Sequence, residues 1–213
     1  MKVTDGTFSL SHGPSVAVGI ITGGGVNWEC TYSLVKAAKA DSFEDFTVFP
    51  NTCYLDAGRN ALVKWFLEET DCSHFLCLDS DISFRPSDID QLAADDLPCV
   101  AGVYYNVYDG VLKPVAKPLP ASETPNLEAD DPLLEVEATG PGFMMLSREL
   151  LEKMGAEYER PMAWFWEPDE NGVHTGEDYG FCRRVRALGV SVYVDLRVQL
   201  SHHKTIRIAG PAG

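Results

Sequence analysis

The sequence predicts an α/β protein built on a Rossmann-like, mostly parallel sheet with helices on both faces. Short apolar runs rich in β-branched residues alternate with amphipathic helical patterns over the first half of the chain, and this alternation is typical of βαβ units. The 213 residues, 45% of them hydrophobic, suffice for one sizeable core. We therefore expect one domain over residues 1–213, with its core at about residues 16–203.

The first half of the chain carries clear signals for element boundaries. A glycine-rich turn at residues 22–25 follows the first apolar run, and Asp56 is placed to cap a helix whose apolar residues recur at steps of three and four. Pro86 precedes a capping box of Ser87 and Asp90, which predicts another helix start. We expect strands at residues 16–21, 46–49, 75–78 and 98–105, and helices at residues 29–40, 56–69 and 86–97.

The second half of the chain differs from the first in composition. Five of the 13 prolines lie within residues 109–132, which predicts a long surface loop with a short strand at residues 111–116. Ser147 begins a predicted helix, and a capping box of Thr175 and Asp178 begins another, which Gly189 ends. We expect extended segments at residues 134–138, 142–146 and 190–194, and helices at residues 147–154 and 175–188.

The charge balance excludes several classes of function. Seventeen Lys and Arg against 32 Asp and Glu leave a net charge of −15, which disfavours non-specific binding to nucleic acids and anionic membranes. No run approaches the roughly 18 apolar residues of a membrane helix, and the polar N-terminus is unlike a signal peptide. We expect a cytoplasmic protein without a membrane partner. The six cysteines form no CxxC pair, which favours buried, reduced thiols over zinc binding.

The segment Leu78-Asp79-Ser80-Asp81 gives the strongest local signal for chemistry. An apolar strand ends there in two carboxylates two residues apart, so both side chains can point the same way. Open α/β sheets bind ligands at the carboxyl ends of their strands, and carboxylate oxygens suit Mg²⁺ or Mn²⁺. The competing interpretation is that the two acids only cap or solvate a loop.

Three further groups of polar residues are candidates. Glu177 and Asp178 stand at a helix start, whose positive end favours an ionised carboxylate suited to a general base. His202 and His203 follow a late strand and offer imidazole ligands. The pair of Arg59 and Asn60 offers a guanidinium fork and an amide for phosphate. Each group also has a plain interpretation as a helix cap or a solvated surface.

The glycine run after the first strand is no dinucleotide fingerprint. Gly23-Gly24-Gly25 is followed by Trp28 where GxGxxG needs its third glycine, and no P-loop lysine follows. This loop can still let the backbone approach a ligand closely. Tyr104, Tyr105 and the aromatic run 164–166 can stack on a base or a sugar, although such runs more often belong to a core.

In order along the chain, these motifs resemble a glycosyltransferase of the GT-A fold, closest to the compact family-2-like enzymes of bacteriophages and bacteria. The resemblance covers roughly residues 16–203 and includes Ala57-Gly58-Arg59-Asn60 and Thr139-Gly140-Pro141-Gly142-Phe143. It implies that Asp79 and Asp81 hold Mn²⁺ or Mg²⁺ on the donor's diphosphate, with His202 completing the ligation, although the doubled histidine leaves that position ambiguous. It also implies that Asp178 is the base of an inverting reaction, with Glu177 beside it.

The resemblance implies two further sets of contacts. The donor nucleotide sugar is expected to contact Thr22, Gly23, Arg59, Asn60, Asp79, Ser80 and Asp81. The acceptor side is expected to include Gly140, Gly142, Phe143 and Trp164. The resulting hypothesis is metal-dependent transfer of a sugar from a nucleoside-diphosphate sugar to an acceptor hydroxyl, in the host cytoplasm if a phage encodes the chain. A glycan, a protein or a modified DNA base all stay open as acceptor, as do the sugar, the nucleobase and the oligomeric state.

Two other classes compete with this hypothesis. A phosphohydrolase of the haloacid-dehalogenase type also uses an apolar strand followed by DxD, with Asp79 as nucleophile and Asp81 as acid. In that family the motif follows the first strand, whereas two predicted strands precede it here. The second competitor is a non-catalytic nucleotide-sugar binding module that keeps the two aspartates without turnover.

Overall fold

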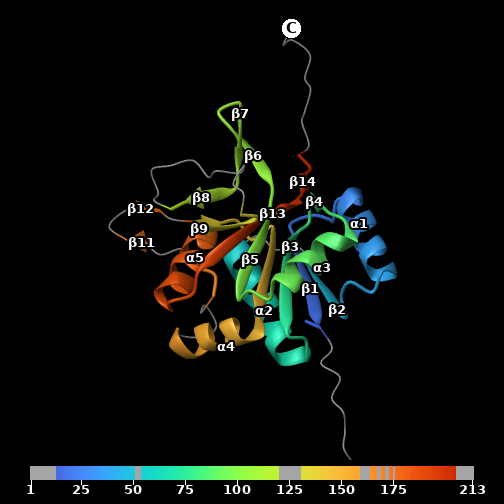
Figure 1. Ribbon diagram of the computed structural model, residues 1–213, viewed down its shortest axis with the longest axis horizontal. Helices are drawn as coiled ribbons and strands as arrows, with labels where there is room; N and C mark the ends of the chain where they lie inside the picture. The colour runs from blue at the N-terminus through green and yellow to red at the C-terminus, as the bar shows by residue number, and fades with distance from the viewer. Residues whose placement is uncertain are drawn as a thin grey trace, which may run out of the picture.

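A computed structural model describes residues 13–50, 54–119, 131–158, 164–166, 169–170, 173–174 and 176–204. Its main sheet has eight strands in the order β2-β1-β3-β10-β5-β13-β9-β8 (Figure 1). These strands are β1 (Val16–Thr22), β2 (Asp45–Pro50), β3 (His74–Asp79), β5 (Cys99–Val103), β8 (Ala116–Pro118), β9 (Leu133–Thr139), β10 (Phe143–Ser147) and β13 (Val192–Gln199).

Most strands of this sheet run in one direction. β1 pairs in parallel with β2 and β3, and β5 pairs in parallel with β13. β10 is antiparallel to both β3 and β5, while β9 is antiparallel to β13 and β8. Six of the eight strands therefore share one direction, with β9 and β10 opposed. The predicted fold class is confirmed, although β10 interrupts the parallel order between β3 and β5.

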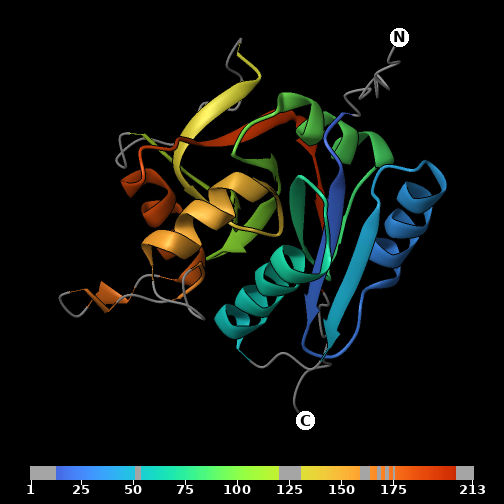
Figure 2. The ribbon, with the colours of Figure 1, turned by 90° about the horizontal axis from the view of Figure 1, so that it is seen from below.

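Helices cover both faces of the sheet (Figure 2). One face carries α1 (Trp28–Lys39) and α3 (Pro86–Asp95), and their apolar residues pack on Val18, Ile20, Leu76 and Leu78. The other face carries α2 (Leu55–Glu69), α4 (Arg148–Glu157) and α5 (Glu177–Ala187). Successive residues of a strand point to opposite faces, so the apolar runs of β1 and β3 supply both cores.

The chain order places a crevice at the carboxyl ends of β1 and β3. β2 lies on one side of β1 and β3 on the other, and the helices that connect these strands, α1 and α2, lie on opposite faces of the sheet. In open α/β sheets, ligands bind outside the strand ends at such a switch point. Thr22 ends β1 and Asp79 ends β3, which brings two predicted site segments to this edge.

The region predicted as a long loop contains a hairpin. β6 (Tyr105–Tyr108) pairs with β7 (Val111–Pro114) and projects from the body of the molecule (Figure 1). Its two-residue turn has positive φ at Asp109 (51°) and Gly110 (76°), as a primed hairpin turn requires. The expected short strand at residues 111–116 is present as β7 and the start of β8.

Short strands complete the described elements, namely β4 (Ile82–Ser83), β11 (Asp169–Glu170), β12 (Val173–His174) and β14 (Ser201–His202). In the described part of the chain, no helix is long and apolar enough to cross a membrane. Five cysteines are free and buried there, as predicted, and Cys53 lies outside the described residues.

Three predicted helix caps are wrong. The N-cap position of α2 is Tyr54, which makes no side-chain cap, and Asp56 lies inside the helix, where its Oδ1 accepts the Ala57 N–H at 2.7 Å. The N-cap of α3 is Arg85, whose N–H donates to Asp88 Oδ2 at 2.7 Å, while the Asp88 N–H donates to the Arg85 backbone carbonyl at 2.9 Å. The N-cap of α5 is Gly176, which makes no side-chain cap, and Thr175 lies outside the described residues.

Candidate active site

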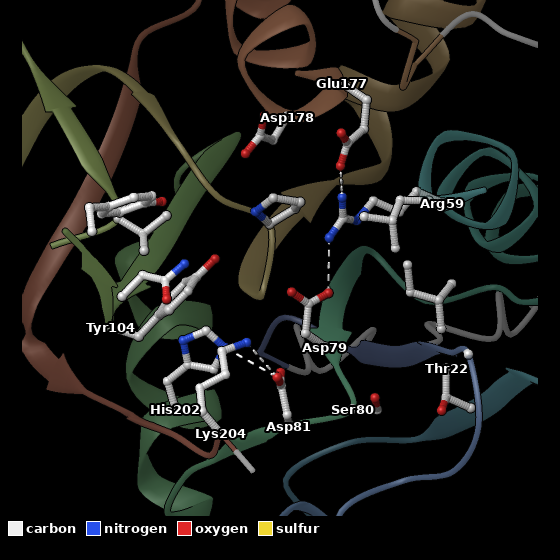
Figure 3. A pocket seen from close by; sticks show the side chains of 17 residues that line it. Thr22, Arg59, Asp79, Ser80, Asp81, Tyr104, Glu177, Asp178, His202 and Lys204 are labelled. Atoms are coloured by element: carbon white, nitrogen blue, oxygen red, sulfur yellow. Dashed lines mark hydrogen bonds and ion pairs between the residues drawn. The ribbon is translucent and has the colours of Figure 1, made fainter. Parts of the chain in front are cut away.

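A cavity of about 450 Å³ opens at the carboxyl edge of the sheet (Figure 3). Its walls come from the ends of β1 and β3, the first turns of α2 and α5, the β6–β7 hairpin and the segment after β13. Nine of the predicted site residues line it, namely Thr22, Gly23, Arg59, Asp79, Ser80, Asp81, Glu177, Asp178 and His202. Segments far apart in the sequence therefore meet here.

Arg59 links two walls of the cavity. Its side chain is 4% exposed, and Nη2 donates to Asp79 Oδ1 at 3.0 Å while Nη1 bonds Glu177 Oε1. Burial alone would lower the pKa of Arg59, but the neighbouring Asp79 and Glu177 raise it above the ordinary value. The predicted phosphate fork is thus engaged with protein carboxylates, and Arg59 holds the end of β3 against the start of α5.

Asp81 lies among positive groups on the lower wall in Figure 3. Its Oδ2 is 3.2 Å from His202 Nε2 and 2.8 Å from Lys204 Nζ. Burial acts to raise the pKa of Asp81, but hydrogen bonds from His202 and Lys204 lower it to about 2. Antiparallel pairing of β14 with β4 produces this contact, because it sets His202 opposite Ile82, the neighbour of Asp81.

The orientation of His202 fits a cation ligand. His202 Nδ1 lies 2.9 Å from the Tyr105 carbonyl oxygen, which accepts only if Nδ1 carries the proton. In the neutral ring Nε2 then presents its lone pair to the Asp81 carboxylate, an arrangement that needs a proton or a cation between them. His203 instead contacts Ser83 Oγ at 2.7 Å through Nε2, so His202 is the histidine that faces the cavity.

The residues of the described chain form no ready-made metal cage. No three His, Cys, Asp or Glu side chains gather there closely enough to hold an ion, because Asp79 is held toward Arg59 and away from the Asp81–His202 pair. Mg²⁺ commonly takes one or two protein carboxylates and fills its other positions with water and substrate phosphates. The donor set present fits a cation that arrives with a phosphorylated ligand.

Asp178 lies on the wall opposite Asp81 and His202, at the first turn of α5 (Figure 3). Its Oδ1 accepts the Tyr179 N–H at 2.8 Å. Burial raises the pKa of Asp178, and the hydrogen bond from Tyr179 only partly opposes this rise. Burial thus acts against the ionised form that the helix start favours.

Some predicted residues lie outside the cavity lining. Asn60 points into the protein, where its Oδ1 accepts the Trp164 and Phe165 N–H groups at 3.2 Å. Trp164 is 1% exposed and donates from Nε1 to the Leu151 carbonyl at 2.8 Å. Phe143 is fully buried, with its ring 5.0 Å from that of Phe84. These three residues shape the core behind the cavity.

Gly140 and Gly142 pack behind the cavity wall rather than lining it. Each faces the side chain of Tyr104, which does line the cavity. The sequence interpretation noted Tyr104 only as one of several aromatic residues.

Other lining residues were missed as site residues, namely Ile21, Leu55, Asn106, Tyr108, Val115, Pro141 and Lys204. Asn106 and Tyr108 were detectable only from the hairpin that presents them, and Lys204 from its position directly after the two histidines.

Comparison with known proteins identifies the fold. No family model matches the sequence, and no curated protein matches it in sequence. Among solved structures, A197 from STIV superposes with a TM-score of 0.63 at 18% identity, covering 90% of this chain and 86% of that one. GalNAc-T7 with UDP, GalNAc and Mn²⁺ gives a TM-score of 0.56 at 10% identity, covering 90% of this chain. This chain has the GT-A-like α/β fold.

The likeness to GalNAc-T7 extends over part of that protein. The chain matches 44% of the length of the GalNAc-T7 structure, so it spans less than half of that relative. At such identities the comparisons establish the fold. The chemistry of this chain depends on the residues that line its cavity.

Proposed function

We propose that this chain is a glycosyltransferase that moves a sugar from a nucleoside-diphosphate sugar to an acceptor hydroxyl. One observation carries the proposal: Asp178 faces the Asp81–His202 pair across a cavity at the carboxyl edge of a GT-A-like sheet. A leaving diphosphate needs a cation, and an attacking hydroxyl needs a base. The ligands bound to GalNAc-T7, UDP and Mn²⁺ among them, support testing these ligand classes here.

Each wall of the cavity has a part in this proposal. Asp81 and His202 would hold Mn²⁺ or Mg²⁺ with the donor's phosphates as further ligands, while Asp79 stays bound to Arg59. A cation bound there would neutralise charge on the departing diphosphate. Asp178 takes the proton of the acceptor hydroxyl as its oxygen bonds to the anomeric carbon and the bond from that carbon to the phosphate oxygen breaks. The stereochemistry would then be inverted.

Arg59 supports this chemistry by fixing the geometry. Its bonds to Asp79 and Glu177 join the two walls that must stay in register. The raised pKa of Asp178 makes its ionised form a stronger base than an exposed aspartate. The chain's charge of −15 does not oppose an anionic donor if the cation and Lys204 offset it at this site.

A thermal-shift panel tests the proposal. The chain is heated with UDP, GDP, CDP and dTDP and with their sugars, each with Mn²⁺, Mg²⁺ or EDTA. A ligand at about 100 times its Kd adds roughly 2.7 kcal/mol to the free energy of unfolding. We expect one nucleotide to stabilise the chain with Mn²⁺ or Mg²⁺ and to lose this effect in EDTA. Stabilisation by none of them would contradict the proposal, and a phosphatase assay would then test the phosphohydrolase alternative.

Turnover separates the transferase from a binding module. Donor hydrolysis and transfer to candidate acceptors are followed with wild type and Asp178→Asn. The variant should keep its donor affinity and lose at least about 100-fold in rate, because Asn cannot accept the proton. Asp90→Asn, on the exposed face of α3, is the matched control. Full activity of Asp178→Asn would refute the assignment of the base.

A further inference from the structure

Tyr104 holds a hydroxyl in the middle of the cavity, and the roles above leave this group unused. The residue directly follows β5, is 5% exposed and lines the cavity. Figure 3 shows its hydroxyl between Asp178 on one side and Asp81 with His202 on the other. Its ring meets that of His202 edge to face, with centroids 5.3 Å apart at 87°. The packing fixes where the hydroxyl lies.

The turn between β9 and β10 is shaped around this hydroxyl. A Cβ added at Gly142 would lie 2.9 Å from the Tyr104 hydroxyl oxygen and 3.0 Å from Asp79 Oδ2. At Gly140 the atom nearest to an added Cβ is again this oxygen, followed by Val115 Cγ1 at 2.8 Å. Real Cβ contacts are longer than these. Two glycines of the Thr139–Gly142 turn thus leave space that the Tyr104 hydroxyl fills.

The proton of this hydroxyl is available to a ligand. A phenol has one O–H to donate, and the Tyr104 oxygen lies beside Gly142. The phenol of a tyrosine is protonated at neutral pH. Within the part of the chain that the structure describes, no residue accepts a hydrogen bond from this O–H. Because Tyr104 lines the cavity, its O–H is placed to donate to a ligand oxygen there.

We propose that Tyr104 determines specificity for the transferred sugar by donating its O–H to one of that sugar's oxygens. This inference rests on the proposed function. The position of the hydroxyl supports this role. The diphosphate belongs beside Asp81 and His202 and the acceptor hydroxyl beside Asp178, so the group between them is the sugar in transfer. A site that hydrogen-bonds a substrate hydroxyl discriminates against analogues that lack it.

Calorimetry on Tyr104→Phe tests this role. The ligands are the nucleotide sugar that most stabilises wild type in the thermal-shift panel and its parent nucleoside diphosphate, both with Mn²⁺. Removing one hydrogen bond should weaken binding of the nucleotide sugar by about 5- to 10-fold and leave the diphosphate within about twofold. Tyr32→Phe, on the exposed side of α1, is the control and should match wild type for both ligands.

Deoxy-sugar donors give a second measurement that needs no stable variant. Wild type should lose about the same 5- to 10-fold for the one deoxy position that Tyr104 contacts. Tyr104→Phe should not distinguish that donor from the full one. Equal affinity of Tyr104→Phe and wild type for the nucleotide sugar, or no sensitive deoxy position in wild type, overturns the inference alone. Failure of wild type to bind any nucleotide sugar of the panel overturns the inference together with the proposed function.

Discussion

At the scale of single residues, Asp81 shows how one carboxylate can serve the free and the ligand-bound protein. Its Oδ2 contacts both His202 Nε2 and Lys204 Nζ, at 3.2 Å and 2.8 Å. The Lys204 side chain is 53% exposed, so solvent screens this ion pair and it is easily broken. A cation held by Asp81 would therefore compete with the ammonium of Lys204 for this carboxylate.

Lys204→Met should change metal and nucleotide binding in opposite directions. Without the competing ammonium, Asp81 binds Mn²⁺ more tightly, by up to about fivefold, since an exposed ion pair is worth at most about 1 kcal/mol. The nucleoside diphosphate should bind more weakly, because a positive group beside its phosphates is lost. Calorimetric titration with Mn²⁺ alone, and then with the diphosphate in Mn²⁺, measures both effects.

Lys64→Met is the matched control for this charge change, because Lys64 lies on α2 and pairs with Glu68 at 3.8 Å. It should leave both affinities unchanged. Unchanged or weaker Mn²⁺ binding by Lys204→Met would show that Lys204 does not compete for Asp81.

The role of a residue could be predicted where it stands at the end of a strand, because the strand fixes where its side chain points. On the first turns of α2 it could not be predicted in the same way. Asp79 ends β3 and Asp81 follows two residues later, so the sheet edge alone sets them in the cavity. Arg59 and Asn60 are adjacent on α2, yet about 100° of helix rotation sends Arg59 to the cavity and Asn60 to the backbone of Trp164. The sequence does not state which of the two faces the ligand, because that depends on how α2 packs.

At the scale of elements, local signals located helices better than they located their first residues. Asp88 follows Arg85 at the same distance along the chain as Asp90 follows Ser87, although an arginine side chain has no acceptor to complete a capping box. The structure uses the first pair, with Arg85 N–H donating to Asp88 Oδ2 at 2.7 Å. Pro86 decides between them, because proline favours the first helical position and so makes the preceding residue the cap.

The Thr139–Gly142 turn gives an element-scale prediction that needs no ligand. Gly140→Ala should lower the free energy of unfolding by about 1–3 kcal/mol, because the new methyl group meets the Tyr104 hydroxyl and Val115 in a packed wall. Adding Tyr104→Phe should recover part of this loss, since it removes the nearest atom. Urea denaturation of the two single variants and the double variant measures the coupling.

Gly24→Ala is the control for backbone effects, because an added Cβ there has nothing within 4 Å. It should shift the free energy of unfolding by less than about 0.5 kcal/mol. Additive effects of Gly140→Ala and Tyr104→Phe would mean that the turn is not shaped around this hydroxyl.

At the scale of the whole molecule, the alternation of strands and helices predicted the layers of the fold. It did not predict which strands pair with one another in the sheet. β10 inserts between β3 and β5 although it follows them in the chain by many residues. Its run of apolar residues, Phe143 to Leu146, is buried on both faces, which suits a central strand of either direction. Strand order therefore depends on contacts that a local pattern does not encode.

The excess of acidic residues also reaches the interior of the molecule. Asp95 of α3 and Asp195 of β13 lie together, with side chains 4% and 0% exposed, and share Arg197. Arg197 Nη2 contacts Asp95 Oδ1 at 2.5 Å, and Arg197 Nε contacts Asp195 Oδ1 at 2.8 Å. Burial, the charge of Asp195 and a hydrogen bond to it raise the pKa of Asp95. One arginine thus only partly compensates two buried carboxylates.

Asp95→Asn should therefore stabilise the protein at neutral pH. Because the pKa of Asp95 is raised by folding, its contribution to stability is full below the unfolded pKa and is lost as pH rises through the folded one. The variant should melt about 2–4 °C above wild type at pH 7, or about 1 kcal/mol for a chain this long, and the gap should close toward pH 4. Asp90→Asn on the exposed side of α3 should show no gap. A lower melting temperature for Asp95→Asn at pH 7 would mean that the ion pair with Arg197 outweighs the repulsion.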